Sequence, residues 1–291
     1  MTPRIETKTY VIIGIALLLW AAAFPGIRAG LEGYGPGELA LFRFGTASVV
    51  LALYAAVTRM RLPDARDLPI IVLAGVVGIS IYHTALNYGE QTVPSAAAAL
   101  IISSSPVFTA MISARFLGER LGWWGWGGVL ASFAGVSLIS LGHGEGLSFD
   151  PNALLILLAA VATALYMTVS KRPLRRYSGL EFTTYAIWAG TVPLLYFAPG
   201  LIEQAPNASL ESTLAAVFLG VFPGAISYVL WSQALSKMPA TSLAVFLNFQ
   251  PVNAAIIAWF WLAEVPSVLT FVGGAVAIAG VAIVQTKGRL R

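Results

Sequence analysis

A polar stripe in the first half of the chain holds side chains suited to binding a polar solute. Ser80, His83, Thr84 and Asn87 are spaced so that they share one face of a helix. The imidazole of His83 can donate a hydrogen bond to a carboxylate or titrate near neutral pH. The alternative, weighed equally, is a structural histidine that hydrogen-bonds to Ser80 or Asn87.

Aromatic and amide side chains at other places in the chain are candidates for the same site. Aromatic residues in such surroundings also serve as packing or interfacial residues, so this is one of two interpretations. Prolines nearby are expected to kink or interrupt the helices that position them. The candidates are Trp20, Phe24, Tyr166, Trp188, Tyr228, Trp231, Asn248 and Gln250, and the prolines are Pro25, Pro106 and Pro251.

The composition places these residues in membrane-spanning helices. Hydrophobic residues make up 58% of the 291 residues and charged residues only 10%, whereas a soluble domain has about 25% charged residues. Ten apolar spans are each long enough to cross a hydrocarbon core, which takes roughly 20 helical residues. We therefore predict an all-α membrane protein with ten transmembrane helices. The spans are about 9–27, 37–58, 68–89, 91–114, 121–142, 151–170, 182–202, 212–236, 238–263 and 265–286.

Charge placement predicts the orientation of these helices. All but two of the 17 Lys and Arg residues, Arg28 and Arg43, fall in alternate loops and the two termini. The positive-inside rule then predicts that both termini are cytoplasmic. Orientation explains the basic run 171–176, so we expect no nucleic-acid partner, and we expect the lipid bilayer to surround the chain.

An internal repeat divides the chain into two halves, 1–146 and 147–291. The stretch SPVFTAMISARFLGER returns 145 residues later as QPVNAAIIAWFWLAEV, so that Glu119 corresponds to Glu264, and we expect a gating or structural role for both glutamates. Further aligned pairs are Gly75 with Gly220, Gly128 with Gly273 and Gly135 with Gly280, and an offset of 143 relates Tyr34 to Tyr177 and Glu38 to Glu181. Since each half has five helices, the second half must enter the membrane inverted. Two inverted halves are typical of carriers that expose one central site alternately to each side.

Arg43 is expected to lie about two turns inside the membrane from the outer end of the second helix. An arginine at the membrane centre costs about 2.5–3.5 kcal/mol on insertion scales, so it needs a partner. Glu264 or Glu90 at the outer side can supply one, and we expect a structural or gating ion pair rather than direct substrate binding. No Asp or Glu lies deep within any predicted span, so proton coupling through a carboxylate is not expected.

The chain resembles the EamA-like family of the drug/metabolite transporter superfamily. The likeness lies in LLLWAAAFPGIRAG (18–30), FRFGTASVVL (42–51), FLGERLGWWGWGGVLASFAGVSLI (116–139), LAEV (262–265) and GGAVAIAGVAIV (273–284). The resemblance implies ten helices and export of small metabolites, most often amino acids, across the inner membrane of a bacterium.

These observations predict a gradient-driven transporter rather than an enzyme. HExxH, GxSxG and P-loop motifs are absent from the sequence, and we expect no metal or cofactor. The expected substrate is a small molecule, an aromatic or apolar amino acid, bound by an aromatic and neutral-polar site. Efflux of aromatic or cationic drugs is the alternative, and a channel-like pore is a third interpretation. The sequence leaves open whether the chain acts as a monomer or a homodimer.

Overall fold

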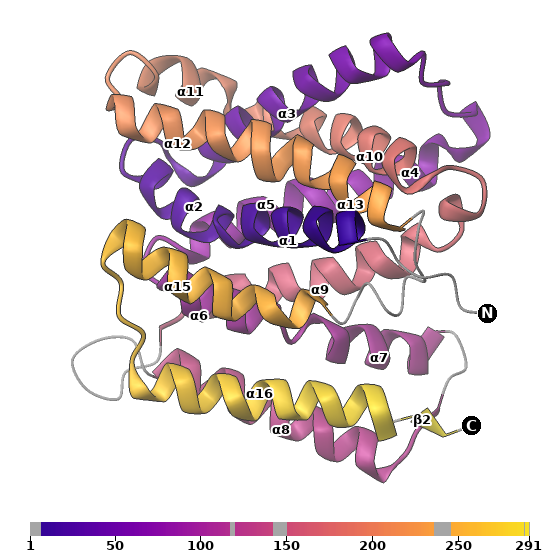
Figure 1. Cartoon of the computed structure of the whole chain (residues 1–291), viewed down its shortest axis with the longest axis vertical. Helices are drawn as coiled ribbons and strands as arrows, with labels where there is room; N and C mark the ends of the chain where they lie inside the picture. Colours follow the sequence, from indigo (N-terminus) through magenta and orange to yellow (C-terminus); the bar gives the residue numbers. More distant parts are fainter. Residues whose placement is uncertain (1–6, 117–119, 142–149, 236–245, 288, 291) are drawn as a thin grey trace.

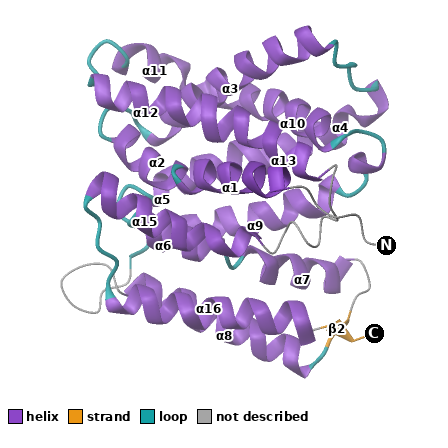
Figure 2. Ribbon diagram, in the orientation of Figure 1, coloured by secondary structure: helices purple, strands orange, loops and turns teal. Residues whose placement is uncertain are grey.

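The computed structural model describes residues 7–116, 120–141, 150–235, 246–287 and 289–290. Within these ranges the chain is helical, apart from turns, short connections and one two-residue antiparallel pair (Figures 1 and 2). In that pair β1 (Arg120–Leu121) lies beside β2 (Arg289–Leu290), which brings the loop after α7 close to the end of the chain.

Among its described residues, the first half of the chain forms eight α-helices. They are α1 (Thr7–Ala21), α2 (Ala23–Leu31), α3 (Pro36–Thr58), α4 (Leu68–Gly75), α5 (Tyr82–Gly89), α6 (Ser95–Ile102), α7 (Ser105–Phe116) and α8 (Trp123–Leu141). A 3₁₀ turn, η1 (Ala65–Asp67), precedes α4, and a π-helical segment, η2 (Val76–Ile81), joins α4 to α5.

The second half follows a similar order within the described residues. Its α-helices are α9 (Ala153–Ser170), α10 (Gly179–Leu194), α11 (Ala198–Gln204), α12 (Leu210–Val221), α13 (Ser227–Leu235), α15 (Gln250–Leu262) and α16 (Val268–Lys287). A π-helical segment, η5 (Phe222–Ile226), joins α12 to α13, and 3₁₀ turns lie at η3 (Pro173–Arg175), η4 (Leu195–Phe197) and η6 (Phe246–Phe249).

Prolines explain several of the interruptions between these helices. A proline lacks the N–H that would bond to the carbonyl four residues earlier, and its ring clashes with that carbonyl. Pro25 therefore cannot donate to the carbonyl of Ala21, and α1 ends at Ala21. Pro106 likewise cannot donate to the carbonyl of Ile102, where α6 ends, and Pro251 lies in the first turn of α15, directly after η6. Two helices thus end shortly before a proline, and a third begins beside one.

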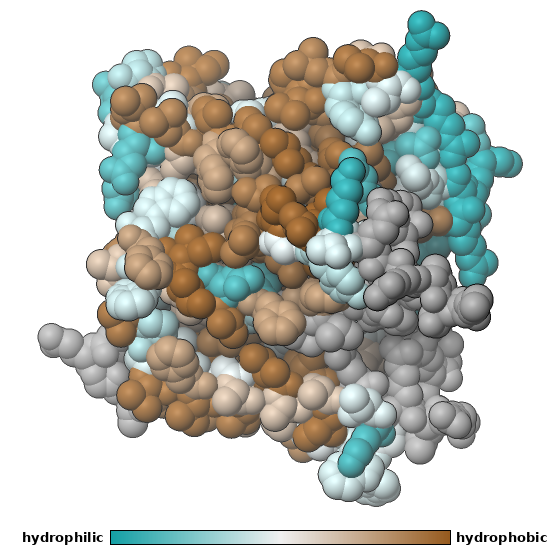
Figure 3. All heavy atoms as spheres, viewed as in Figure 1, coloured by the Kyte–Doolittle hydropathy of each residue, from teal (hydrophilic) through white to brown (hydrophobic). Residues whose placement is uncertain are grey.

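The helices have the length and the surface of a membrane protein. Seven helical stretches among the described residues are long and apolar enough to cross a membrane, and 123–139 and 268–284 are shorter apolar helices. Hydrophobic residues cover most of the described face in Figure 3, while hydrophilic residues gather mainly toward the left and right edges, where helices end. The chain is therefore a multi-pass membrane protein, whereas the number of ten helices stays a prediction.

Glycines on α8 and α16 allow these two helices to lie in backbone contact. A Cβ atom added at Gly128 would lie 2.7 Å from the carbonyl oxygen of Gly280, and one added at Gly280 would lie 2.6 Å from that of Gly128. Gly135 and Gly273 face each other in the same reciprocal way, at 2.5 and 2.6 Å. The predicted close approach at these four glycines is confirmed, as is usual where small residues line a membrane helix interface.

Two more contacts of glycines correspond between the halves. A Cβ at Gly75 would lie 2.4 Å from the carbonyl oxygen of Ala186, and one at Gly220 would lie 2.7 Å from that of Arg43. Gly75 and Gly220 are 145 residues apart, and Arg43 and Ala186 are 143 apart, the two offsets found in the sequence. The third helical stretch of each half thus packs closely on the second stretch of the opposite half.

Irregular backbone also recurs at corresponding positions. The π-helical segment 222–226 lies 145 residues after 77–81, inside the other π-helical segment. Ser48 Oγ and Thr191 Oγ1, 143 residues apart, hydrogen-bond to each other at 3.0 Å, so equivalent positions meet where α3 and α10 cross. π-helical segments inside helices are frequent at functional sites, and both segments adjoin the residues described next.

Candidate functional site

Arg43 is a buried arginine without a complete set of partners. It lies on α3 with 4% of its surface exposed, and its Nε and Nη1 atoms have no hydrogen-bond partner. Tyr82 and Tyr228 lie close enough to interact with it electrostatically, and so does Glu90. Its guanidinium carbon is 5.2 Å from the ring centroid of Phe44. A buried guanidinium in this condition is suited to binding an anion.

His83 lies among aromatic rings beside this arginine. Its ring centroid is 4.3 Å from that of Phe44 and 4.4 Å from that of Tyr82, and its Nδ1 atom has no hydrogen-bond partner. Ser80 instead donates to the carbonyl of Gly190 at 2.6 Å. The suggestion that Ser80 or Asn87 satisfies His83 is therefore wrong.

Asn87 shares the predicted polar face but serves to join α5 to the start of α3. Its Nδ2 atom donates to the carbonyl of Pro36 at 2.9 Å, and its Oδ1 atom is buried without a partner. His83 and Asn87 are thus buried on this face of α5, and two polar atoms, Nδ1 of His83 and Oδ1 of Asn87, have no hydrogen-bond partner.

Three of the predicted aromatic residues meet across α1 and α13. The ring of Trp20 is 5.4 Å from that of Tyr228 and 5.0 Å from that of Trp231. Trp20 Nε1 donates to the carbonyl of Pro223, inside η5, at 3.2 Å. Phe24, one turn further along, has 4% of its surface exposed and belongs to the main hydrophobic core. Trp20, Tyr228 and Trp231, all half-buried, are called the aromatic cluster below.

Tyr166 and Trp188 belong to a different group of rings. Tyr166 stacks on Phe182 at 6.0 Å, and Trp188 lies 6.1 Å from Tyr185 while its Nε1 donates to the carbonyl of Ser48 at 3.3 Å. The expected single aromatic set is therefore divided between two places. Tyr166 still lies within electrostatic range of Tyr228.

The amide residues near Pro251 are less fully described. Gln250 is the first residue of α15 and is half-buried. The backbone of Asn248 lies in η6, but its side chain is outside the described part of the chain. Glu119 also lies outside the described residues, and its gating role stays a prediction.

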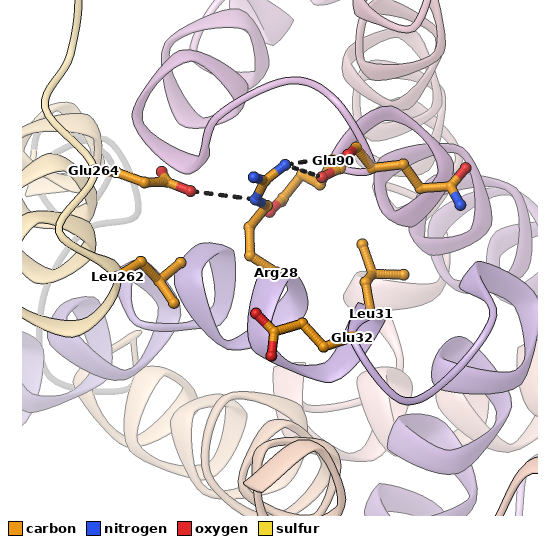
Figure 4. A pocket seen from close by; sticks show the side chains of 7 residues that line it. Arg28, Leu31, Glu32, Glu90, Leu262 and Glu264 are labelled. Atoms are coloured by element: carbon orange, nitrogen blue, oxygen red, sulfur yellow. Dashed lines mark hydrogen bonds and ion pairs between the residues drawn. The ribbon is translucent and has the colours of Figure 1, made fainter. Parts of the chain in front are cut away.

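The expected ion pair between Arg43 and Glu264 is wrong, because Glu264 binds another arginine. Glu264 Oε1 lies 3.2 Å from Nε of Arg28 (Figure 4). Its Oε2 accepts a hydrogen bond from the backbone N–H of Ser95 at 2.9 Å. Arg28 Nη1 also donates to the carbonyls of Glu90, at 2.8 Å, and Gln91, at 3.3 Å. Together these contacts join α2, α6 and the segment after α15, and we call them the outer latch, after the orientation predicted from the sequence.

A cavity of about 340 Å³ adjoins the outer latch. It is lined by Arg28, Leu31, Glu32, Glu90, Gln91, Leu262 and Glu264. Glu32 and Gln91 are exposed and lie at its rim, whereas Glu90 has no exposed surface. The cavity therefore leads from solvent to a buried carboxylate.

Glu90, named from the sequence only as a possible partner of Arg43, is a fully buried carboxyl. It follows α5 directly, and both of its carboxylate oxygens lack a hydrogen-bond partner. Burial raises the pKa of Glu90 well above its ordinary range, an effect that Arg28 and Arg43 oppose and Glu264 reinforces. The signal in the sequence was its position at the end of an uncharged span, opposite Arg28 at the same side of the membrane. Tyr82 was also missed, because it lies beside the polar face of α5 rather than on it.

Comparisons with known proteins confirm the resemblance drawn from the sequence. A profile of the EamA-like transporter family matches residues 7–141 and 151–286. The chain is 43% identical to "Uncharacterized transporter YdfC" of Bacillus subtilis (strain 168), over 92% of this chain and 88% of that protein. It is 41% identical to a "Probable terminal-alkyne amino-acid exporter" of Streptantibioticus cattleyicolor, over 98% of this chain and 96% of that protein.

The fold also resembles that of a solved structure. The TM-score is 0.62 over 96% of this chain and 98% of the solved chain, with 21% sequence identity. At that identity the likeness concerns the fold alone.

Proposed function

Because the chain belongs to the EamA-like transporter family, we propose that it exports small apolar or aromatic amino acids and that Arg43 binds their carboxylate. The family and the similar proteins are transporters and not enzymes. The relative from Streptantibioticus cattleyicolor, named as a probable amino-acid exporter, supports this class of substrate. The bacterial relatives favour the inner membrane as its location.

The unpaired guanidinium of Arg43 is the observation on which the proposal depends. Ionisable groups inside a membrane protein are costly and typically mark a substrate or ion pathway. Arginine binds carboxylates through parallel N–H donors, and Nε and Nη1 are both available here. The nearby aromatic cluster offers apolar contacts to the side chain of an amino acid. An anion-binding centre also disfavours the alternative substrate class, a purely cationic drug.

Transport by alternating access between two inverted five-helix halves, 1–146 and 147–291, is part of this proposal. The glycine contacts, the π-helical segments and the Ser48–Thr191 hydrogen bond all recur with the repeat offsets, which supports it. Exchange of the two conformations opens a central site to each side in turn. In this view the outer latch closes the exterior side, and Glu119 takes the place of Glu264 in a corresponding inner contact.

The proposed function is tested by counterflow in proteoliposomes. The vesicles hold unlabelled phenylalanine, and labelled phenylalanine is added outside without any ion gradient. A carrier with an amino-acid site gives transient accumulation of label that other apolar amino acids block and aromatic cations do not. Block by the cations alone would favour drug efflux, and flux without saturation or accumulation would favour a pore.

Replacing Arg43 tests its role in the same assay. Arg43→Gln is expected to lower exchange at low substrate concentration by about 10- to 100-fold, since a hydrogen bond to a charged group contributes about 1.5–3 kcal/mol. Arg66→Gln is the matched control, because the side chain of Arg66 is 74% exposed and pairs only with Asp64 among the described residues. Arg43→Gln protein that is folded and exchanges as fast as the control would refute carboxylate binding by Arg43.

A further inference from the structure

Two buried ionisable side chains, Arg43 and Glu90, interact electrostatically at this site without forming an ion pair. Glu90 has no hydrogen-bond partner for either carboxylate oxygen, and Arg43 has none for Nε or Nη1. Each is within electrostatic range of the other. No ion pair joins them among the described residues, although both are buried. Arg43 thus lacks an anion, and Glu90 lacks a cation.

The arginine nearest to Glu90 is already bound elsewhere. Arg28 Nε forms an ion pair with Glu264, and Arg28 Nη1 donates to the backbone carbonyls of Glu90 and Gln91. Arg28 therefore does not hydrogen-bond to the side-chain carboxylate of Glu90. Asp150, at the start of the neighbouring α9, is likewise occupied by Thr92 and the backbone of Asn152. The charged and titratable groups around Glu90 are Arg28 and Glu32 on or beside α2, Arg43 on α3, Tyr82 and His83 on α5, Asp150 before α9, and Glu264 after α15.

The cavity beside the outer latch gives Glu90 a route to solvent and a negative lining. Glu32, Glu90 and Glu264 bring three carboxyl groups and Arg28 brings one guanidinium. When all three acids are ionised, the lining has a net charge of three minus one, that is two negative charges. A lining of this sign attracts protons and ammonium groups from the outer solution.

We infer that Glu90 is a second binding site of the carrier, at which a proton and the ammonium group of the amino-acid substrate compete. The inference rests on the proposed function for its substrate. A zwitterion offers the two charges that the buried residues lack, a carboxylate for Arg43 and an ammonium for Glu90. In the empty carrier a proton neutralises Glu90, and a substrate from the cytoplasm releases that proton. Each turnover therefore exchanges one amino acid outward for one proton inward.

Competition between protons and substrate predicts a dependence of affinity on pH. Where Glu90 is protonated in the empty carrier, the apparent KM for phenylalanine rises about tenfold for each unit by which the pH falls. Glu90→Gln removes the titrating group and keeps its size, so its KM is expected to be independent of pH between about pH 5 and about pH 8. Because the amide holds the ammonium group less tightly than the carboxylate does, Glu90→Gln is expected to need more phenylalanine for counterflow, and acceleration of its export by an acidic exterior is lost. Glu203→Gln, which changes an exposed carboxyl on α11 outside the cavity lining, is expected to behave like the wild type.

A second readout does not depend on the substrate. A carboxyl whose pKa is higher in the folded than in the unfolded state stabilises the fold below the unfolded pKa, and this stability is lost as the pH rises through the folded pKa. The unfolding temperature of the wild type and of the control Glu203→Gln is expected to fall over that interval, and that of Glu90→Gln to stay level. If Glu90→Gln follows the wild type in both pH profiles, the inference is overturned.

Wild-type protein alone gives a further test, should the variant fail to fold. Phenylalanine added to purified transporter in a weakly buffered solution is expected to release protons, which a pH-indicator dye reports. Binding of phenylalanine without proton release overturns the inference. Absence of phenylalanine binding and counterflow in the wild type refutes the proposed function, and the pH profiles of unfolding still decide whether Glu90 is a proton site.

Discussion

At the scale of single residues, Trp20 is the ring best placed to select among apolar substrates. It contacts both other members of the aromatic cluster, Tyr228 and Trp231, and its Nε1 binds the π-helical segment at Pro223. In Trp20→Ala, the concentration needed to inhibit counterflow is expected to rise about 3- to 10-fold more for phenylalanine than for alanine. The reason is that one aromatic pair contributes about 0.5–1.5 kcal/mol.

Two variants separate the ring of Trp20 from its N–H group and from general effects of losing a tryptophan. Trp20→Phe keeps an aromatic face and is expected to keep most of the preference for phenylalanine. Trp259→Ala removes a ring that is 56% exposed on α15 and is expected to leave the preference unchanged. Equal weakening of phenylalanine and alanine by Trp20→Ala would show that Trp20 supports the fold and not the selection of substrate.

At the scale of helices, the contact between α8 and α16 depends on the absence of a side chain at Gly128. The added methyl group of Gly128→Ala would lie 2.7 Å from the carbonyl oxygen of Gly280 and 3.0 Å from the backbone nitrogen of Val284, so the helices must separate. We expect a loss of about 1–3 kcal/mol, measured as a lower unfolding temperature in detergent.

Gly127 provides the matched control for this prediction. It precedes Gly128 on the same helix, and a Cβ atom there meets nothing within 4 Å. Both substitutions gain about 1 kcal/mol of helix propensity, so any difference between them reports the helix contact. Gly127→Ala is expected to be neutral or stabilising, and equal unfolding temperatures for the two variants would contradict the contact.

The positions of the helices could be predicted from the sequence more reliably than the contacts between them. Uncharged spans and prolines are local signals, so the positions of the helices and the breaks at Pro25 and Pro106 could be predicted. The partner of Glu264 depends on how α2 packs against the end of α15, which no local pattern encodes. The burial of Glu90 also depends on helix packing. It was missed because a charged residue at the end of an apolar span is normally expected to be exposed.

The aromatic candidates show the same limit. Trp20 and Tyr228 were predicted to share a site, and their rings are in contact. Tyr166 and Trp188 satisfied the same criteria of type and depth, yet they pack with Phe182 and Tyr185 in another cluster. Residue type and depth in the membrane thus identify candidates, and helix packing decides which of them meet.

At the scale of the whole molecule, the orientation in the membrane remains a prediction that the arrangement of helices makes easy to test. The loop after α3 and the loop after α11 lie at opposite edges of the bundle in Figure 1. Leu62 in the first loop is 78% exposed, and Asn207 in the second is also exposed. The natural chain has no cysteine, so a single introduced thiol at either place is the only one present.

A maleimide that does not cross membranes then reports the side on which each loop lies. With cytoplasmic termini, Asn207→Cys is labelled in intact cells and Leu62→Cys only after the cells are made permeable, because the basic loops stay inside. The opposite pattern would invert the protein and place Arg28, Glu90 and Glu264 on the cytoplasmic side. The cavity at Glu90 would then take its protons from the cytoplasm, and proton exchange could no longer drive export. The orientation therefore decides whether the paired binding of a zwitterion by Arg43 and Glu90 can move amino acids out of the cell.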